Sequence, residues 1–406
     1  MSKNSNKISG PIDDVKVLDM SRVLGGPYCT QLLGDLGASI VKLEPPQGDE
    51  TRDWGPPFKD DEAAYFMGVN RNKSSISLDI SKKAGQKILF KMLEDIDVLV
   101  ENFKPGTMEK WGIGFEELKK IFPKLIHCRV SGFGSSGPLG GLPGYDALLQ
   151  AMCGWFSVNG EPESDGVRMG IPLIDLGTGL FASNAILAAL LERQRSGKGQ
   201  FVEVTLFDTG IALQHPHAAN WFVSKKQPER VGNAHTNIAP YDSFPTMTIP
   251  IYMSVGNNRQ FKILCTVLGD KELPDNKKFL NNAERVKNKN QLRKILIKLL
   301  SDKDGEEISN KLLKSGVPAG PILTIEGILS HKHTLNRNMV IEKDGYNGLG
   351  IPIKFQRTPG SIRKKPPIFA EDTYTVFKNL GISKKEIDEL IKMKILFTER
   401  QKTKKN

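Results

Sequence analysis

The fold is decided by the stretch that holds Val15-Lys-Val-Leu-Asp-Met20 and Ser39-Ile-Val-Lys-Leu-Glu44. Each run is short and apolar, as in a buried strand, and Gly25-Gly-Pro27 with a helical pattern at residues 28–36 connects them. A strand, a helix and a second strand in this order predict a parallel sheet with helices on its faces. Ligands of such folds bind at the carboxyl ends of the strands.

The same alternation continues along the first half of the chain. Further strands are expected at 75–78, 98–100, 125–130 and 200–206, and helices at 85–95, 145–157 and 208–222. We therefore expect a large Rossmann-like α/β domain over residues 1–223. A polar stretch, Ser224-Lys-Lys-Gln-Pro-Glu-Arg230, opens a linker and a smaller α+β domain over residues 224–330. Residues 331–406 are expected to return to the large domain.

Composition narrows the possible function classes. The chain has 406 residues, 39% of them hydrophobic, and a net charge of +11. Its lysines lie on predicted surface helices without interleaved aromatic residues, so we expect no nucleic-acid partner. The apolar helix at 180–191 is interrupted by Ser183 and Asn184 and is shorter than the ~18 residues that span a bilayer, so we expect no membrane partner. With a polar N-terminus, these features predict a cytoplasmic location.

Neither a metal site nor a disulfide framework is expected. The four cysteines are far apart and form no C-x-x-C pair, and we interpret them as small buried residues: Cys29, Cys128, Cys153 and Cys265. His215 and His217 flank a proline without a third ligand near them in the sequence, which favours packing over metal binding.

Two segments before residue 111 are candidate ligand sites. Residues 45–58 form a polar loop longer than a connector needs, and long loops are often functional. After the strand at 98–100, Lys104 and Lys110 lie near the start of a helix, where a phosphate binds readily. Surface lysines are common, so a purely solvated role for both remains open.

A glycine-rich loop follows the strand at 125–130. Gly132, Gly134 and Gly137 match the G-x-G-x-x-G dinucleotide motif, but Pro138 follows where that motif needs a helix. A nicotinamide dinucleotide site is therefore disfavoured. We interpret residues 132–144 as a loop that allows close backbone approach to a ligand or closes over one.

Asp175 is the one charged residue in Gly170-Ile-Pro-Leu-Ile-Asp-Leu-Gly-Thr-Gly179, ahead of the apolar helix at 180–191. We expect an extended run that turns at Gly177 and Gly179, and then a helix that is apolar on nearly every face and hence buried. A carboxylate just before such a helix is supported by free N–H groups and by the helix dipole, so it is expected to stay ionised. The pattern leaves two roles open for it, a helix cap and a carboxylate nucleophile.

Taken together, these segments resemble the class III CoA-transferases, the family of formyl-CoA transferase and carnitine CoA-transferase. The resemblance covers most of the chain, from about Ile12 to the last predicted helix. It rests on eight motifs in a fixed order: Val17-Leu-Asp-Met-Ser-Arg-Val-Leu-Gly-Gly-Pro27, Leu33-Gly-Asp-Leu-Gly-Ala-Ser-Ile-Val-Lys-Leu-Glu44, Gly48-Asp-Glu-Thr-Arg-Asp-Trp54, Asn70-Arg-Asn-Lys73, Val100-Glu-Asn-Phe-Lys-Pro-Gly106, Ser131-Gly-Phe-Gly-Ser-Ser-Gly-Pro138, Gly144-Tyr-Asp146, and Asp175 before its helix.

The resemblance implies that Asp175 is the nucleophile, with an acyl-CoA and a carboxylic acid as substrates and no permanently bound cofactor or metal. It implies CoA contacts from nine residues: Val23, Leu24, Gly25, Leu78, Asp79, Asn102, Phe103, Lys104 and Lys110. Tyr145 and Asp146 would line the reacting end, where backbone N–H groups of Gly132 and Gly134 would support an oxyanion. Leu24 and Pro45 stand where some transferases have polar or basic residues. The family also implies a homodimer of interlocked rings.

Within the family, three segments are most similar to succinyl-CoA:glutarate-type enzymes: Thr51-Arg-Asp-Trp-Gly-Pro-Pro-Phe58, Val69-Asn-Arg-Asn-Lys73 and His217-Ala-Ala-Asn-Trp-Phe222. A dicarboxylate acceptor is therefore expected. Its distal carboxylate would be held by Arg52, Arg71 or His235, each of which has a structural role as the alternative.

Two other functions remain as alternatives. An α-methylacyl-CoA racemase needs two proton-transfer groups, and Tyr145 stands where that branch has a histidine, which disfavours racemisation. A non-catalytic protein that binds CoA esters would form no covalent adduct at Asp175.

Overall fold

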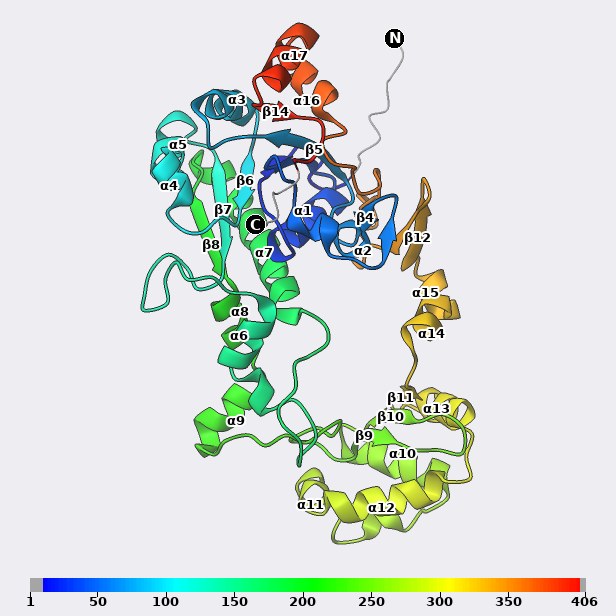
Figure 1. The fold of residues 1–406 in the computed structure, drawn as a ribbon. Helices are drawn as coiled ribbons and strands as arrows, with labels where there is room; N and C mark the ends of the chain where they lie inside the picture. The colour runs from blue at the N-terminus through cyan, green and yellow to red at the C-terminus, as the bar shows by residue number, and fades with distance from the viewer. Residues whose placement is uncertain (1–9, 402–406) are drawn as a thin grey trace. The chain divides into compact units, whose positions relative to one another are not determined.

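A computed structural model describes residues 10–401. The chain divides into two compact units (Figure 1). The larger unit comprises residues 1–153, 169–215 and 336–406, and the smaller one residues 154–168 and 216–335. The sequence-based division instead has its bounds at residues 223 and 330, so residues 154–168, 216–223 and 331–335 lie on different sides in the two divisions.

A seven-stranded sheet forms the centre of the larger unit, in the order β14-β5-β2-β1-β6-β7-β8. The strands are β1 (Lys16–Asp19), β2 (Ser39–Glu44), β5 (Lys73–Leu78), β6 (Val98–Glu101), β7 (Ile126–Ser131), β8 (Phe201–Thr205) and β14 (Leu396–Phe397). All neighbours are parallel except β14, which pairs antiparallel with β5. This confirms the predicted α/β class with a mainly parallel sheet.

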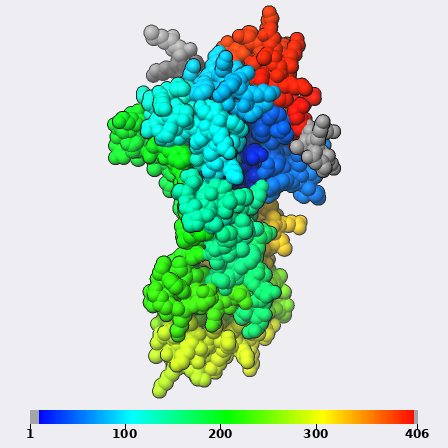
Figure 2. All heavy atoms as spheres, turned by 60° about the vertical axis from the view of Figure 1, so that its left-hand side comes forward, coloured from blue at the N-terminus to red at the C-terminus, as the bar shows by residue number. Residues whose placement is uncertain are grey.

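Helices cover the sheet on both faces, as parallel sheets require. One face carries α3 (Lys83–Leu93), α4 (Thr107–Trp111), α5 (Phe115–Ile121), α16 (Thr373–Asn379) and α17 (Lys384–Lys392), which share one apolar core with the strands. On the other side, α1 (Gly25–Asp35) packs along α7 (Leu173–Ser196), and α6 (Asp146–Met152) and α8 (Leu206–Ala212) pack against α7. The C-terminal helices thus lie beside the N-terminal half of the chain (Figures 1 and 2).

The two faces of the central strands differ in character. Leu18, Leu43 and Ile76 belong to the apolar core. Side chains alternate between the two faces of a strand. The other face of these strands therefore carries four fully buried charged residues: Asp19, Lys42, Glu44 and Lys73. Buried charges need partners, and these four pair among themselves and with nearby residues.

The strand order reverses direction at β1. From β1 the chain moves outward to β2 and β5, and it then returns to place β6 on the opposite side of β1. The connections that leave the carboxyl ends of β1 and β6 therefore separate at this point. In an open parallel sheet such a reversal opens a crevice that is the usual place for a ligand.

The smaller unit has its own core around a three-stranded antiparallel sheet in the order β11-β10-β9. Its strands are β9 (Tyr241–Phe244), β10 (Ile251–Ser254) and β11 (Ala319–Pro321), and its helices are α9 (His217–Ser224), α10 (Asn258–Leu268), α11 (Asn282–Lys287), α12 (Lys289–Leu300), α13 (Gly305–Lys314) and α14 (Ile325–Ser330). The single helix expected at 208–222 is two helices, α8 and α9, because the chain turns ahead of Pro216.

Short elements complete the fold. Two hairpins, β3 (Phe58–Lys59) with β4 (Glu62–Ala63) and β12 (Val340–Lys343) with β13 (Tyr346–Leu349), lie in the larger unit with α2 (Ala64–Met67). A turn of 3-10 helix covers Glu50–Asp53, two more occur at Trp155–Ser157 and Leu273–Asp275, and α15 (Lys332–Asn336) spans the boundary between the units.

Helix α7 differs from its prediction in length and burial. It begins at Leu173, so Gly177 and Gly179 are helical and do not form a turn. Leu180, Phe181 and Leu191 are exposed, so the helix is not buried on every face. Among residues 10–401, α7 has the length and composition of a membrane-spanning helix, and 44% of its most apolar window is buried inside the fold.

Candidate active site

A pocket of about 220 Å³ lies where the strand order reverses. Its walls come from the carboxyl ends of four strands: residues 22–25 after β1, residues 102–105 after β6, residues 130–132 at the end of β7, and Leu206 after β8. The glycine-rich loop adds residues 142–145, and Asp175 reaches the pocket from α7. The pocket thus lies where the topology predicts a ligand site.

Asp175 occupies the third position of α7, whose N-cap is Pro172. The first N–H groups of the helix are capped by a different carboxylate: Asp146 Oδ2 accepts hydrogen bonds from the N–H of Ile174 at 2.9 Å and of Asp175 at 3.2 Å. The expectation that Asp175 precedes the helix is therefore wrong, and the role of helix cap, one of the two left open for it, belongs to Asp146. Its carboxylate projects from the first turn and lines the pocket.

The environment of Asp175 suppresses its ionisation. Burial, followed by the charge of Asp146, raises the pKa of Asp175 from 3.8 to about 7. The predicted support from free N–H groups is weaker than expected because Asp146 occupies two of those donors. The expectation that Asp175 stays firmly ionised is therefore corrected: desolvation outweighs the helix terminus, and the group titrates near neutral pH.

The glycines of this region serve close packing. A Cβ on Gly179 would lie 2.7 Å from the carbonyl oxygen of Gly25, so α1 and α7 touch backbone to backbone. A Cβ on Gly177 would lie 2.8 Å from Leu213, beyond the end of α8. A Cβ on Gly25 would lie 3.3 Å from the backbone oxygen of Asp175. The first turns of α1 and α7 therefore meet at the pocket.

A second pocket of about 280 Å³ adjoins the first. Its lining includes Leu78 and Asp79 after β5, Pro45 after β2, and Trp111 of α4. Phe103 lines both pockets and makes an edge-on contact with Trp111, with ring centroids 5.7 Å apart. Phe103 is thus a wall that the two pockets share.

Nine of the predicted site residues line the pocket of Asp175: Val23, Leu24, Gly25, Asn102, Phe103, Lys104, Gly132, Tyr145 and Asp175 itself. Leu78, Asp79 and Phe103 line the second pocket. Lys110, Gly134 and Asp146 line neither pocket. Asp146 acts on Asp175 through its charge and through the cap of α7.

The basic residues expected at the acceptor lie elsewhere. Arg52 is fully buried and forms ion pairs with Glu44 at 2.6 Å and with Glu62 at 2.7 Å. Arg71 pairs with Asp35 at 2.6 Å and lines a separate pocket. Neither guanidinium is among the groups that line the pocket of Asp175. His235 belongs to the smaller unit.

Several residues of the site were missed by the sequence reasoning. Arg22 and Glu50 line the pocket and form an ion pair at 3.0 Å. Glu50 lies in the long loop at 45–58, whose length was the available signal. Tyr65 of α2 is close enough to feel the active-site charges: burial, followed by Asp175 and Asp146, raises the pKa of its hydroxyl to about 12. No sequence pattern marks Tyr65, because α2 is a single turn.

The glycine-rich loop and the cysteines follow their sequence interpretation. No helix begins at Gly137, and the chain stays irregular until α6, so the dinucleotide motif lacks its structural context. The backbones of Gly132 and Gly144 touch at the base of the loop. All four cysteines are free and buried. Within the described part of the chain, no group of three His, Cys, Asp or Glu side chains is placed to hold a metal ion.

The fold and this site combine a mainly parallel α/β sheet with a pocket at its carboxyl edge that is lined by a buried carboxylate. Residues 12–373 match the family model for CoA-transferase family III, and the chain belongs to this family.

Three relatives illustrate the match. Succinyl-CoA:glutarate CoA-transferase of Mus musculus is 39% identical over 91% of this chain and 86% of its own length. Acetyl-CoA:oxalate CoA-transferase of Acetobacter aceti is 39% identical over 86% of this chain and 90% of its own. The crystal structure of a CAIB/BAIF family protein from Brucella suis superposes with a TM-score of 0.83 at 37% identity, covering 92% of this chain and 100% of that one. Membership of the family confirms the resemblance derived from the motifs.

Proposed function

We propose that this enzyme moves CoA from succinyl-CoA to glutarate, with Asp175 as the covalent carrier. The observation that carries the proposal is a buried carboxylate in a pocket at the reversal point of the sheet, in a chain of CoA-transferase family III. The substrate pair is suggested by relatives from Mus musculus and Agrobacterium fabrum, which are named as transferases acting between succinate or succinyl-CoA and glutarate.

The reaction proceeds through four exchanges at one carboxylate. Asp175 attacks the thioester carbonyl, the carbon–sulfur bond breaks, and a succinyl-aspartyl anhydride and CoA thiolate result. The thiolate then attacks the aspartyl carbonyl, releasing succinate and leaving an aspartyl-CoA thioester. Glutarate attacks this thioester to form a glutaryl-aspartyl anhydride and thiolate, and the thiolate takes the glutaryl group. Atoms and charge balance without ATP, and Asp175 is regenerated.

The near-neutral pKa of Asp175 suits this chemistry. A carboxylate that burial makes costly to ionise is weakly solvated in its charged form. Because it is weakly solvated, it is a stronger nucleophile toward the acyl group that it carries. Each attack creates an oxyanion that needs N–H donors. Helix α1 has no side-chain cap, and its N-cap Leu24 and its first residue Gly25 line the pocket. The leading N–H groups of α1 and the N–H of Gly132 are therefore the donors that we propose.

CoA is proposed to extend through both pockets. Leu78 and Asp79 would border its adenine end, Phe103 its middle, and residues 23–25 the pantetheine arm that carries the thioester to Asp175. Lys104 and Lys110, on the connection after β6 and on α4, remain the proposed partners of the phosphates. The amide of Asn102 is committed to the backbone of Arg22, so it would act by shaping this wall.

The acceptor is proposed to bind beside Tyr145 and Tyr65. Because Arg52 and Arg71 are ion-paired away from the pocket, we assign them structural roles. The role of His235 stays a prediction from the sequence, and Arg22 and Lys104 are cations that line the pocket. A homodimer of interlocked rings and a cytoplasmic location remain predictions, as does the absence of nucleic-acid and membrane partners.

The test is an assay of CoA transfer without nucleotide. The purified protein is incubated with succinyl-CoA and glutarate, and acyl-CoA products are separated by chromatography, with oxalate and mesaconate as competing acceptors. Glutaryl-CoA should form, and Asp175→Ala should lower its rate by about 10³-fold or more. If no acid accepts CoA while α-methylacyl-CoA exchanges its α-proton with D₂O, the enzyme is a racemase. If neither reaction occurs although CoA esters bind, it is a binding protein.

A further inference from the structure

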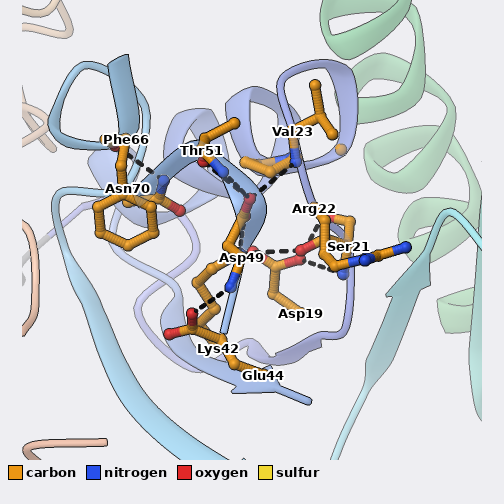
Figure 3. Close-up of polar contacts among 12 residues, drawn as sticks. Asp19, Ser21, Arg22, Val23, Lys42, Glu44, Asp49, Thr51, Phe66 and Asn70 are labelled. Carbon is orange, nitrogen blue, oxygen red and sulfur yellow. Dashed lines mark hydrogen bonds and ion pairs between the residues drawn. The ribbon is translucent and has the colours of Figure 1, made fainter. Parts of the chain in front are cut away.

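The turn between β1 and α1 is held by side chains from other strands (Figure 3). The N–H of Ser21 donates to Asp19 at 2.9 Å, and Lys42 donates to the carbonyl oxygen of Ser21 at 2.8 Å. The side-chain amide of Asn102 both accepts from the N–H of Arg22 and donates to its carbonyl oxygen, at 2.9 and 2.7 Å. Asp19 and Lys42 are fully buried, so these contacts are shielded from water.

Val23, near the end of this turn, has an unfavourable backbone conformation. Its φ is +71°, in the left-handed region that a β-branched residue strongly disfavours. Such residues persist only where the surroundings over-determine them, and they gather at functional sites. Val23 lines the pocket that contains Asp175 and stands two residues before the first residue of α1.

One buried carboxylate ties Val23 to the interior. The N–H of Val23 donates to Asp49 Oδ1 at 3.3 Å, and Thr51 donates to the same oxygen from its N–H and its hydroxyl. The other oxygen, Oδ2, pairs with Lys42 at 3.0 Å. Asp49 does not line the pocket of Asp175, but it is hydrogen-bonded to Val23, which does.

The surroundings of Asp49 keep it charged and in place. Burial alone would raise its pKa, but Lys42 and the hydrogen bonds of Thr51 together bring the pKa below the usual 3.8. Its own N–H donates to Glu44 at 2.9 Å, and Glu44 is in turn fixed by Arg52. A chain of buried charges therefore runs from Arg52 to the turn at Val23.

We propose that Asp49 is a positioning residue of the transfer reaction: by holding Val23 in its left-handed conformation, it aligns the first turn of α1 with the thioester at Asp175. The inference rests on the proposed function. Without this carboxylate, Val23 relaxes to a negative φ and the N–H groups at the start of α1 turn away from Asp175. Chemistry then slows although the acyl-CoA still binds.

The test is a double-mutant cycle between Asp49→Ala and Val23→Gly, measured as kcat and KM for succinyl-CoA. Glycine adopts a positive φ without a side-chain penalty, so in its presence the turn no longer depends on Asp49. We expect Asp49→Ala to lower kcat by about 100-fold with a much smaller change in KM. Adding Val23→Gly should restore kcat by about tenfold.

A matched control separates positioning from general stability. Asp35→Ala removes an equally buried carboxylate, the partner of Arg71, at the far end of α1. Its effect on kcat should not depend on Val23→Gly. Recovery of kcat by Val23→Gly in the Asp35→Ala background as well, or no recovery in the Asp49→Ala background, overturns the proposal. Thermal denaturation of every variant establishes that it is folded.

If Asp49→Ala does not fold, Thr51→Val tests the same contact, because the Thr51 hydroxyl donates to Asp49 at 2.7 Å. A smaller fall in kcat that Val23→Gly relieves supports the proposal, and an unchanged kcat contradicts it. The proposed function is tested separately by the wild-type assay. If the wild type transfers CoA while the Asp49 variants match it, only the positioning role fails; if the wild type transfers nothing, the proposed function itself fails.

Discussion

At Asp175 two opposing influences on the charge of a carboxyl group meet. The start of a helix favours the ionised form, and burial beside a second carboxylate disfavours it. The structure shows that burial dominates, because the helix donors are taken by Asp146. If this carboxyl group is the nucleophile, as we propose, a pKa of about 7 makes the activity of the enzyme sensitive to pH in the physiological range.

The rate of acyl transfer should follow the ionisation of Asp175. Single-turnover acylation by succinyl-CoA should rise with pH through about 7, because only the carboxylate attacks. Asp146→Asn keeps an oxygen that caps α7 but removes the charge that raises the pKa of Asp175. The acid limb of the pH–rate profile of this variant should therefore move to lower pH. Rapid-quench measurements from pH 5 to 9 give both profiles, and a limb that stays in place or moves upward rejects this electrostatic coupling.

The stability of the fold should change with pH in the direction opposite to the acylation rate. The pKa of Asp175 is about 7 when folded and near 3.8 when unfolded, so the unfolded state ionises first and stability falls as the pH rises from about 4 to 7. The difference corresponds to on the order of 4 kcal/mol. Asp175→Asn should remove this loss. The free energy of unfolding of the variant, measured with urea, should therefore increase relative to that of the wild type between pH 4 and 8. The exposed Asp14→Asn should show no such gain; equal slopes for wild type and Asp175→Asn would refute the assignment.

Sequence reasoning found Asp175 but mistook the surroundings of several residues. The motif order identified the family and most of the pocket lining, because those residues follow strand ends that the sequence marks clearly. Arg52 and Arg71 were predicted to hold the acceptor carboxylate, with a structural role as the alternative, because their segments are similar to succinyl-CoA:glutarate-type enzymes. Their partners, Glu44 and Asp35, become visible only when the strand faces and the end of α1 are placed in space.

At the scale of elements, α7 shows why local propensity misplaced a boundary. The sequence predicts a turn at Gly177 and Gly179 because glycine lets the backbone turn tightly. In the fold each glycine instead accommodates a neighbour, α1 at Gly179 and Leu213 at Gly177, and this packing outweighs the cost of glycine in a helix. The helix ends at Gly197, whose φ of +72° is typical of a glycine that caps a helix C-terminus.

The cap of α7 should be worth a measurable amount of stability. Asp146 accepts from two N–H groups at the start of the helix, so Asp146→Ala should lower the free energy of unfolding by about 1 kcal/mol. Asp146→Asn, which keeps a capping oxygen, should cost less. Chemical denaturation at pH 8 measures both. Equal losses in the two variants would show that the charge, and not the cap, stabilises this helix start.

At the scale of the whole molecule, large apolar side chains are exposed in both units. Leu180 and Leu191 on α7, and Phe222 and Val223 on α9, are more than half exposed. Exposed apolar patches mark interaction surfaces. The homodimer implied by the family resemblance would cover such side chains, and it stays a prediction.

The dimer has a direct test. Sedimentation at micromolar concentration should give twice the 45.0 kDa chain mass. Replacing Phe222 and Val223 together by Glu should shift the protein toward the monomer, because charges would have to be buried. Met393→Glu, an exposed apolar residue beyond the end of α17, is the control and should leave the mass unchanged. A wild type that sediments as a single chain contradicts the prediction.

The central claim is that Asp175 forms a covalent bond with the acyl group, and mass spectrometry of the trapped enzyme tests it most directly. The protein is incubated with succinyl-CoA, treated with hydroxylamine and digested. We expect a hydroxamate on Asp175 of the wild type, and none in Asp175→Ala. CoA transfer that proceeds while this peptide stays unmodified, or a hydroxamate on another residue, would contradict the account.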